Sequence, residues 1–525
     1  MFLATLSSLI ASLVAFAVYK LRKGLREVNY IPGIRSPFSP LSPLGASLPC
    51  TFWNPTHEWP WYWRKTGYFN QTHDIVSTVP FLLGTPSLYT SSLDVMKQLL
   101  NSEGTRLEKP RELSSALQWG DNITSVNGDV WRTHRRIVAP SFTTRMYGDV
   151  WKSARNVYSD MINSEQWNNK TKVSIPQFNT TMCRVTITII SNCGFGLSLK
   201  WSDKDGPVSE APKDDFPEAL RIVSETSLHR LLIPSWAFNL PIKRLREIQN
   251  AWNVVETFIL SAIDRRKEED LDSESLDDTN VPGDMLNRLV MGWLRDDKHG
   301  LTKKDVLADM FTLVFAGHET TASGLSATFG YLAVNPDIQQ KAFEEVSRVF
   351  AENNPAEQLD PTKLSYTFNC FLEALRLVPS GFFLPRRATG DITLKISRPQ
   401  PGTVFVKKGT LIMIDLIGIH RNPEIFEDPH SYKPERWAGV AEHETALFGF
   451  GTRACIGRKF AHTEVLCFIS SFLHDWKIEP LYGSVQGETK EVWEENVLGR
   501  AGLTGTAFGL KSVPLKFVRR VGNSA

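Results

Sequence analysis

The chain lacks the features that define several common protein classes. Its six cysteines form no C-x-x-C pair and no regular framework, so disulfides are not expected. The net charge of +2 gives no overall field that would attract nucleic acid. There is no internal repeat and no G-x-G-x-x-G phosphate loop between a strand and a helix. These absences argue against repeat arrays, nucleic-acid binding and a built-in dinucleotide site, and 42% hydrophobic residues suffice for one large core.

An uncharged run occupies the N-terminus, from Phe2 to Tyr19. As a helix, this run would span roughly 27 Å, close to the hydrocarbon thickness of a bilayer. Basic residues follow the run and none precedes it, which favours a membrane anchor over a cleaved signal peptide. The signal peptide stays the alternative, because Ala15-Phe16-Ala17 offers a small-residue cleavage site. We therefore expect an anchor over residues 1–20, with everything after it on the cytosolic side.

The remaining chain divides by composition into a hinge and a body. Residues 21–50 are basic and then rich in proline, which predicts a semi-rigid hinge. The body, residues 51–525, has mainly helical spacing, with strands predicted around Ile392 to Ile414. The acidic stretch from Lys267 to Asp284 also contains Ser, Pro and Gly, and it is predicted to be a loop. The fold class is mainly α with small β-sheets, preceded by a single transmembrane helix.

The segment from Phe448 to Gly457, FGFGTRACIG, presents Cys455 in a glycine-rich loop. Gly451 and Gly457 allow backbone conformations closed to other residues, so that a flat cofactor can approach and peptide N–H groups can face the sulfur. An apolar helix is predicted directly afterwards, and a helix N-terminus beside a thiol favours its deprotonated form. Arg453 adds a positive charge. A buried structural cysteine is the alternative, and we keep it for the other five cysteines.

The pattern F-x-x-G-x-R-x-C-x-G resembles the haem-binding signature of the cytochrome P-450 family. With average residue frequencies, it has a chance probability of roughly 10⁻⁴ in a chain of this length. The resemblance implies the cytochrome P-450 fold and a heme b cofactor. It also implies that Cys455 is the axial ligand of the iron, that Arg453 pairs with a haem propionate and that Phe448 contacts the cofactor.

A long helix is predicted from Thr302, which has capping-box spacing to Asp305, to about Val334. Its middle reads AGHETT from Ala316 to Thr321. Small residues would leave room for a ligand there, and a threonine that bonds back to an earlier carbonyl can bend a helix. Taken alone, the segment fits a helix with a polar stripe.

Together with Cys455, this segment resembles the oxygen-activation motif of the family. The resemblance implies that Glu319 and Thr320 guide protons to iron-bound dioxygen. His318, their neighbour, receives no role.

Two further sets of residues resemble family features. Glu373 and Arg376 stand three apart on one helix face, which alone indicates only a surface pair. With Arg436 in PERW, they resemble the charge triad that fixes the fold behind the haem, a structural role.

The second set concerns the haem propionates. Trp131 and Arg135, four residues apart, resemble the tryptophan-arginine pair that the family uses on one propionate. Arg386 occupies the place of a further propionate-facing basic residue, and its neighbour Arg387 is an alternative for that role.

Electrons must come from another protein, because no nucleotide fingerprint is present. By resemblance, the donor is NADPH-cytochrome P-450 reductase, with cytochrome b5 as a further partner. A set of basic residues could form a positive patch on the cysteine side: Arg132, Arg135, Arg136, Arg458 and Lys459. Those of them that are exposed would attract an acidic redox partner, and the alternative is an ordinary solvated basic face.

The resemblance implies a haem-thiolate monooxygenase on the cytosolic face of the endoplasmic reticulum membrane. It would insert one oxygen atom of O₂ into a lipophilic small molecule such as a terpenoid, a fatty acyl chain or a polycyclic compound. The alternatives are a reductase-independent isomerase or dehydratase and a non-catalytic haem-binding protein. Glu319 and Thr320 favour oxygenation, because isomerising and dehydrating members often lack that pair. The sequence as a whole also resembles those of fungal members of the family.

Overall fold

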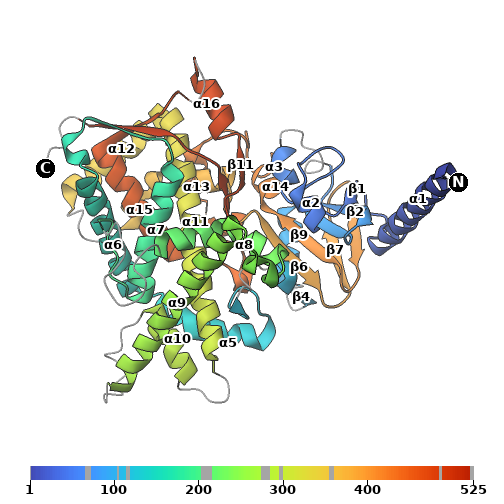
Figure 1. Ribbon diagram of the computed structural model, residues 1–525. Coiled ribbons are helices and arrows are strands. Elements are labelled where there is room, and N and C mark those ends of the chain that lie inside the picture. Colours follow the sequence, from blue (N-terminus) through green and yellow to red (C-terminus); the bar gives the residue numbers. More distant parts are fainter. Residues whose placement is uncertain are drawn as a thin grey trace. The chain divides into compact units, whose positions relative to one another are not determined.

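The structure is a computed structural model (Figure 1). It describes residues 2–64, 72–102, 106–113, 119–202, 216–272, 284–294, 300–353, 360–440, 442–483 and 487–520. The chain forms two compact units. Unit 1 comprises residues 1–113, 381–431 and 443–454, and unit 2 comprises residues 114–380, 432–442 and 455–525. The boundary near the cysteine loop therefore falls between Ala454 and Cys455.

Unit 1 is built on a six-stranded mixed sheet with the order β1-β2-β3-β9-β6-β4, accompanied by a β7–β8 hairpin. The strands are β1 (Gly33–Phe38), β2 (Ile75–Leu83), β3 (Ser87–Thr90), β4 (Leu107–Glu108), β6 (Phe383–Ala388), β7 (Ile392–Ile396), β8 (Gly402–Val406) and β9 (Leu411–Asp415). Ile412 and Ile414 of β9 pack into one apolar cluster and Leu411 and Met413 into another. Successive side chains point to opposite faces of a strand, so β9 is buried on both faces. The predicted strands around Ile392 to Ile414 are confirmed.

Short helices complete unit 1: α2 (Pro43–Ser47), α3 (Trp59–Tyr62), α4 (Leu93–Lys97) and α14 (Leu416–His420). The first helix, α1 (Phe2–Glu27), extends away from the sheet (Figure 1), and only its C-terminal part contacts β2. There, Lys20 Nζ donates to Leu82 O at 3.1 Å, and Gly24 lets the helix lie against Val79. The stretch Thr5–Glu27 is long and apolar enough to cross a membrane.

Unit 2 is mainly helical. Its helices are α5 (Gly128–Val138), α6 (Thr144–Ser164), α7 (Phe178–Phe195), α8 (Phe216–Leu232), α9 (Lys243–Asp272), α10 (Met285–Leu294), α11 (Lys303–Val334), α12 (Pro336–Glu352), α13 (Ser365–Leu377), α15 (Arg458–Asp475) and α16 (Lys490–Val497). Helix α11 runs through the middle of the unit (Figure 1), where α7, α13 and α10 pack against it. The mainly α fold class with small sheets is confirmed.

Two small antiparallel sheets lie at the edge of this helical body. One has the order β10-β13-β5, and the other is the β11–β12 hairpin. Their strands are β5 (Lys172–Ile175), β10 (Trp476–Pro480), β11 (Ala501–Leu503), β12 (Phe508–Leu510) and β13 (Leu515–Arg519). The hairpin contacts α11 through β12, so its turn lies close to the middle of that helix.

The predicted limits of two segments can be compared with the structure. The capping box is confirmed, because the Thr302 hydroxyl accepts from Asp305 N–H while the Asp305 carboxylate accepts from Thr302 N–H. The loop predicted from Lys267 is wrong at its start, since α9 continues to Asp272. Lysine and glutamate are good helix formers, so a charged stretch does not by itself end a helix. The rest of that prediction, residues 273–283, lies outside the described residues.

Candidate active site

Cys455 lies just before the N-terminus of α15, whose N-cap is Gly457. The cysteine is exposed, whereas Cys370 and Cys467 in unit 2 are buried and all six cysteines are free thiols. The positive end of the helix dipole favours a thiolate at this position. Burial raises the pKa of Cys467 to about 12, which makes that thiol inert in comparison. Exposure and the helix terminus therefore single out Cys455.

Arg135 approaches Cys455 within unit 2. Both Trp131 and Arg135 are half-buried on α5, with the guanidinium carbon 5.9 Å from the centre of the indole ring. Burial lowers the pKa of Arg135, and the charge of the Cys455 thiolate opposes that shift. The structure thus brings Trp131, Arg135 and Cys455 together.

The loop before Cys455 belongs to unit 1. Gly449 and Gly451 have positive φ angles of 78° and 69°, which only glycine adopts readily, and Phe448 and Arg453 are half-buried. The expectation that Gly457 also needs a special backbone conformation is wrong, because its φ is −84°.

Arg386 is buried on β6 of unit 1, and 6% of its surface is exposed. Its Nη1 donates to its neighbour's carbonyl, Pro385 O, at 2.7 Å. Arg387 points to the other face of the strand, where its Nη1 donates to Gly409 O at 3.1 Å. Of the two alternatives, Arg386 is the enclosed one.

The AGHETT segment lies in the middle of α11 and has two distinct faces. Ala316 and Thr320, four residues apart, are exposed although most of this helix is buried. The Thr320 hydroxyl donates to Ala316 O at 2.9 Å, and the helix continues without interruption to Val334. The prediction that Gly317 leaves room for a ligand is wrong, because a Cβ there would lie 2.9 Å from Ile190 Cγ1 of α7. The free space lies over Ala316 and Thr320 instead.

Glu319 lies on a different face of α11, and only 5% of its surface is exposed. Its Oε1 accepts from Thr506 N–H at 2.9 Å, and its Oε2 accepts from the Thr506 hydroxyl at 2.8 Å. Burial raises the pKa of Glu319 to about 7, although these hydrogen bonds oppose the shift. The carboxyl group can therefore gain or lose a proton near neutral pH.

The contacts of His318 hold its imidazole in place inside unit 2. Its Nδ1–H donates to Val314 O at 2.9 Å, and its Nε2 lies 3.4 Å from Ser224 Oγ. Burial lowers the pKa of His318 to about 4, so the imidazole is neutral.

The predicted charge triad is assembled within unit 2. Glu373 and Arg376 have no exposed side-chain surface, and Glu373 Oε1 accepts from Arg376 Nη2 at 2.8 Å and from Arg436 Nε at 2.9 Å. Two donors that the sequence did not reveal complete the shell of the carboxylate. These are Lys433 N–H and the Trp437 indole, at 2.9 and 3.0 Å.

The comparisons with known proteins identify the family of this chain. The family model described as "Cytochrome P450" matches residues 58–498. The chain belongs to the cytochrome P450 family. Cytochrome P450 monooxygenase 124 of Postia placenta is 27% identical over 98% of this chain and 99% of its own. Human cytochrome P450 4F12 is 25% identical over 80% of this chain and 83% of its own. Cyclooctat-9-en-7-ol 5-monooxygenase of Streptomyces melanosporofaciens is 26% identical over 74% of this chain and 79% of its own.

Membership of the cytochrome P450 family implies an oxidoreductase that incorporates oxygen and holds a haem through a thiolate. The residues present fit such a group. The buried Arg386 guanidinium has further N–H groups for a propionate, whose charge would raise the pKa of Arg386 from the value of about 10 that burial produces. A Cβ at Gly457 would meet only Phe142, at 4.0 Å, so the protein leaves free space beside this glycine.

A buried pair that the sequence did not reveal ties three segments of this cytochrome P450 together. Asp309 of α11 is fully buried, and its Oδ2 lies 2.6 Å from His134 Nδ1 of α5. Its Oδ1 accepts from Ile123 N–H at 2.6 Å. Burial alone would lower the pKa of His134, but the hydrogen bond and charge of Asp309 outweigh it and raise the pKa. The pair holds α5, which carries Trp131 and Arg135, against α11.

We predict that Asp309→Asn lowers the stability of the holoprotein by about 1–3 kcal/mol at about pH 6, because the charged partner of His134 is lost. A raised histidine pKa contributes stability that is present below its unfolded value and disappears as the pH rises through the folded value. The difference from wild type should therefore shrink in alkaline solution. Thermal unfolding at several pH values measures it, and a pH-independent difference would contradict the charged pair.

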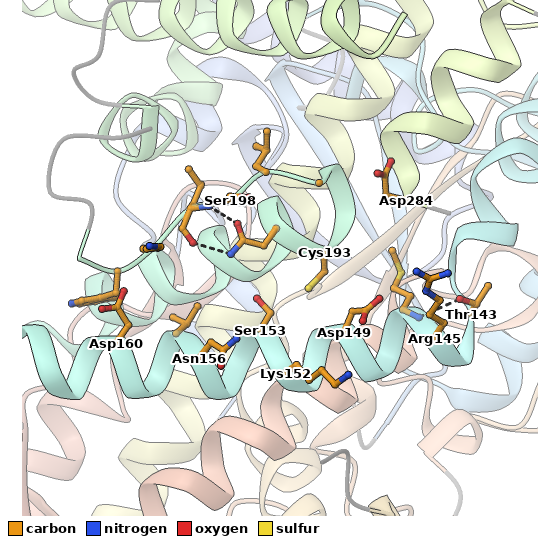
Figure 2. A pocket seen from close by; sticks show the side chains of 18 residues that line it. Thr143, Arg145, Asp149, Lys152, Ser153, Asn156, Asp160, Cys193, Ser198 and Asp284 are labelled. Atoms are coloured by element: carbon orange, nitrogen blue, oxygen red, sulfur yellow. Dashed lines mark hydrogen bonds between the residues drawn. The ribbon is translucent and has the colours of Figure 1, made fainter. Parts of the chain in front are cut away.

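Cys455 is not among the lining residues of two cavities in the described part of unit 2. One, of about 790 Å³, is a groove between α6 and the end of α7 with the chain that follows it (Figure 2), and both apolar and charged residues line it. Figure 2 shows that Arg145, Asp149, Lys152 and Asp160 line it from α6, with Cys193 on the opposite wall. The other cavity, of about 400 Å³, reaches Glu319 and His318.

The predicted basic set lies on α5 and at the start of α15, both in unit 2. Arg132, Arg136 and Lys459 are exposed, whereas Arg135 and Arg458 are half-buried. Arg132 forms an exposed ion pair with Asp129 of its own helix. Three of the five cations of this set are therefore exposed.

Proposed function

We propose that this chain is a membrane-anchored haem-thiolate monooxygenase in which Cys455 is the iron ligand. The observation that carries the proposal is the exposed Cys455 at the N-terminus of α15, electrostatically coupled to Arg135. Haem held in this way supplies dioxygen chemistry, in which thiolate donation favours O–O cleavage. The remaining residues position the cofactor and move protons.

Each cofactor-binding residue has a distinct task in this proposal. Arg386, Arg453 and the Trp131–Arg135 pair would hold the haem propionates through hydrogen bonds. Phe448 would cover the thiolate and exclude water from it. The Glu373–Arg376–Arg436 triad binds no cofactor and stabilises the fold of unit 2.

Glu319 and Thr320 would supply the protons that oxygen reduction consumes. A catalytic acid works best when its pKa lies near the working pH, as the pKa of about 7 for Glu319 does. Thr320 lies on the exposed face of α11 and presents its hydroxyl next to the free space over Ala316. This pair favours oxygenation over isomerisation or dehydration, which need no proton supply to dioxygen, and over a non-catalytic haem protein.

The three functions differ in what they require. Oxygenation requires NADPH, a reductase and O₂, and the product acquires one atom of oxygen-18 from ¹⁸O₂. Isomerisation or dehydration proceeds without the reductase, and a haem sensor forms no product. Product that forms without reductase, or that contains no oxygen-18, would contradict the proposal.

We predict that Thr320→Ala binds haem normally but lowers the yield of product per NADPH by about tenfold or more, with hydrogen peroxide as the main product of oxygen reduction. The reason is that the hydroxyl beside the free space is lost. Peroxide and product are measured per NADPH consumed. Thr321→Ala is the matched control, since the Thr321 hydroxyl makes the same kind of bond, to Gly317 O at 3.0 Å, on a buried face. Equal coupling in both variants would exclude a role for Thr320.

The location and electron donor follow from the same proposal. Residues 1–20 would anchor the chain in the endoplasmic reticulum membrane, and residues 51–525 would be the catalytic body in the cytosol. Residues 21–50, predicted to be a semi-rigid hinge, would connect them as a packed segment, because they end α1 and form β1 and α2 of unit 1. The exposed cations Arg136 and Lys459 would attract NADPH-cytochrome P-450 reductase and cytochrome b5, because complementary charge speeds encounter.

The substrate would be a lipophilic small molecule, such as a terpenoid, a fatty acyl chain or a polycyclic compound. A membrane-anchored enzyme meets such molecules in the bilayer. Two similar proteins carry substrates in their names, cyclooctat-9-en-7-ol in one and leukotriene B4 in the other.

A further inference from the structure

Ser380 donates a hydrogen bond to the backbone of Thr320. It follows the last residue of α13 by three positions, and only 8% of its surface is exposed. Its Oγ–H donates to Thr320 O at 3.0 Å. In a continuous α-helix such as α11, this carbonyl also accepts from the N–H four residues later, that of Gly324. Thr320 O therefore has two donors, and one of them comes from outside its helix.

Close packing of α13 on α11 brings Ser380 within reach of this carbonyl. Gly324 lies about one helical turn after Thr320, and a Cβ there would lie 2.9 Å from Phe371 Cε2 and 3.1 Å from Leu375 Cδ2. Both are buried side chains of α13. Because Gly324 has no side chain, α13 can approach α11 closely, and the chain that leaves α13 reaches Thr320.

The backbone of Ser380 is fixed independently of its hydroxyl. Ser380 O accepts from Phe508 N–H of β12 at 2.9 Å, and Phe508 O accepts from Ser323 Oγ–H at 2.8 Å. Ser323 lies on α11 three residues after Thr320, so the two residues are neighbours on the surface of that helix. Ser380, β12 and α11 therefore form a closed ring of hydrogen bonds, which Ser380→Ala would break at one bond only.

The bond from Ser380 differs from the bonds that the hydroxyls of α11 make nearby. Thr320 and Thr321 donate to carbonyls of their own helix, Ala316 O and Gly317 O, so these bonds move with α11. Ser380 instead ties the carbonyl of Thr320 to a segment outside the helix. The backbone of Thr320 is therefore held in place, whereas its hydroxyl can leave Ala316 O by rotation about the Cα–Cβ bond.

We propose that Ser380 is a positioning residue for the oxygenation reaction, which fixes the backbone of Thr320 so that the Thr320 hydroxyl turns to one defined point in the free space beside it. Ser380 itself takes no part in proton transfer. A fixed backbone matters because a displacement of about 1 Å in a reacting group can lower a rate by about a hundredfold. The inference rests on the proposed role of Thr320 and adds the residue that holds it.

The first test measures this tether by hydrogen–deuterium exchange of the holoprotein, followed by mass spectrometry of the peptide that contains Gly324. Ser380→Ala should speed exchange there about fivefold, which corresponds to about 1 kcal/mol, the usual contribution of one hydrogen bond. Ser326→Ala is the matched control, because that buried hydroxyl donates to Ala322 O within α11 itself. Exchange in Ser380→Ala no faster than in wild type would contradict the tether.

The second test is a double-mutant cycle on the yields of product and peroxide per NADPH. Ser380→Ala should raise the share of peroxide several-fold, because the Thr320 hydroxyl is misplaced, and Ser380→Thr should restore it because a hydroxyl is kept. In the Thr320→Ala background, Ser380→Ala should add nothing, since the hydroxyl that Ser380 positions is already absent. An equal rise in both backgrounds would show a merely structural role and overturn the inference.

The outcomes separate this inference from the proposed function. If Thr320→Ala itself stays coupled, the proposed role of Thr320 fails, and faster exchange in Ser380→Ala then shows a structural tether only. If Thr320→Ala uncouples oxygen reduction whereas Ser380→Ala stays coupled, the positioning role of Ser380 fails and the proposed function stands.

Discussion

Replacement of Glu373 by alanine is expected to prevent this cytochrome P450 from accumulating as a folded holoprotein. The carboxylate is the common partner of Arg376 and Arg436 and also accepts from Lys433 N–H and the Trp437 indole. Its loss leaves the fully buried Arg376 guanidinium without the compensating charge. Removal of one partner from a buried ion pair costs about 3–5 kcal/mol, and here two cations lose the charge of the Glu373 carboxylate. The total stability of a domain is only about 5–15 kcal/mol.

The measurement is the yield of soluble holoprotein and the midpoint of its unfolding in urea. Glu373→Gln should be intermediate, because the amide keeps an acceptor but not the charge. Glu494→Ala is the matched control, since Glu494 forms an exposed ion pair with Lys490 at 3.6 Å in the same unit. Such pairs contribute at most about 1 kcal/mol. A Glu373→Ala protein as stable as this control would show that the triad has no structural role.

The fold was predictable where local pattern and tertiary packing agree. The capping box at Thr302 and the length of α11 follow from local chemistry, and the strands near Ile392 follow from apolar alternation and turn residues. The end of α9 was not predictable, because charged residues such as those from Lys267 to Asp272 occur equally in loops and in exposed helices. The role of Gly317 was misjudged, because the residue that fills the space, Ile190, belongs to another helix.

The candidate site shows the same division. Cys455 and the Glu319–Thr320 pair belong to short motifs, so they could be identified from the sequence. Thr506 contacts Glu319 from a hairpin 187 residues further along the chain, and Asp309 meets His134 across 175 residues. Neither threonine nor aspartate carries a local signal for such a contact, since the partner is set only by the packing of distant elements. Likewise, only the structure shows that Arg386 is the enclosed member of the pair Arg386–Arg387.

The larger effect on activity is expected from Cys455→Ala, which should abolish product formation altogether. The variant removes the proposed iron ligand from the N-terminus of α15, whereas the charge triad remains to stabilise unit 2. Because Cys455 is exposed, its truncation leaves no cavity in the core, and the unfolding midpoint of the haem-free variant should stay close to that of the haem-free wild type. Loss of activity with retained stability separates a ligand from a structural cysteine.

Cys467→Ala supplies the matched control. Cys467 lies on the same helix, α15, but is fully buried, and its Sγ lies 3.5 Å from Trp151 O. Its truncation should lower the stability modestly and leave the activity per haem unchanged.

The most direct test of the account is the absorption spectrum of the reduced protein under carbon monoxide. A thiolate bound to the haem iron shifts the main band strongly to the red, and we predict this band for wild type and for Cys467→Ala. Cys455→Ala should lack it completely. A red-shifted band that persists in Cys455→Ala would contradict the assignment of Cys455 as the haem ligand, and with it the proposed active site.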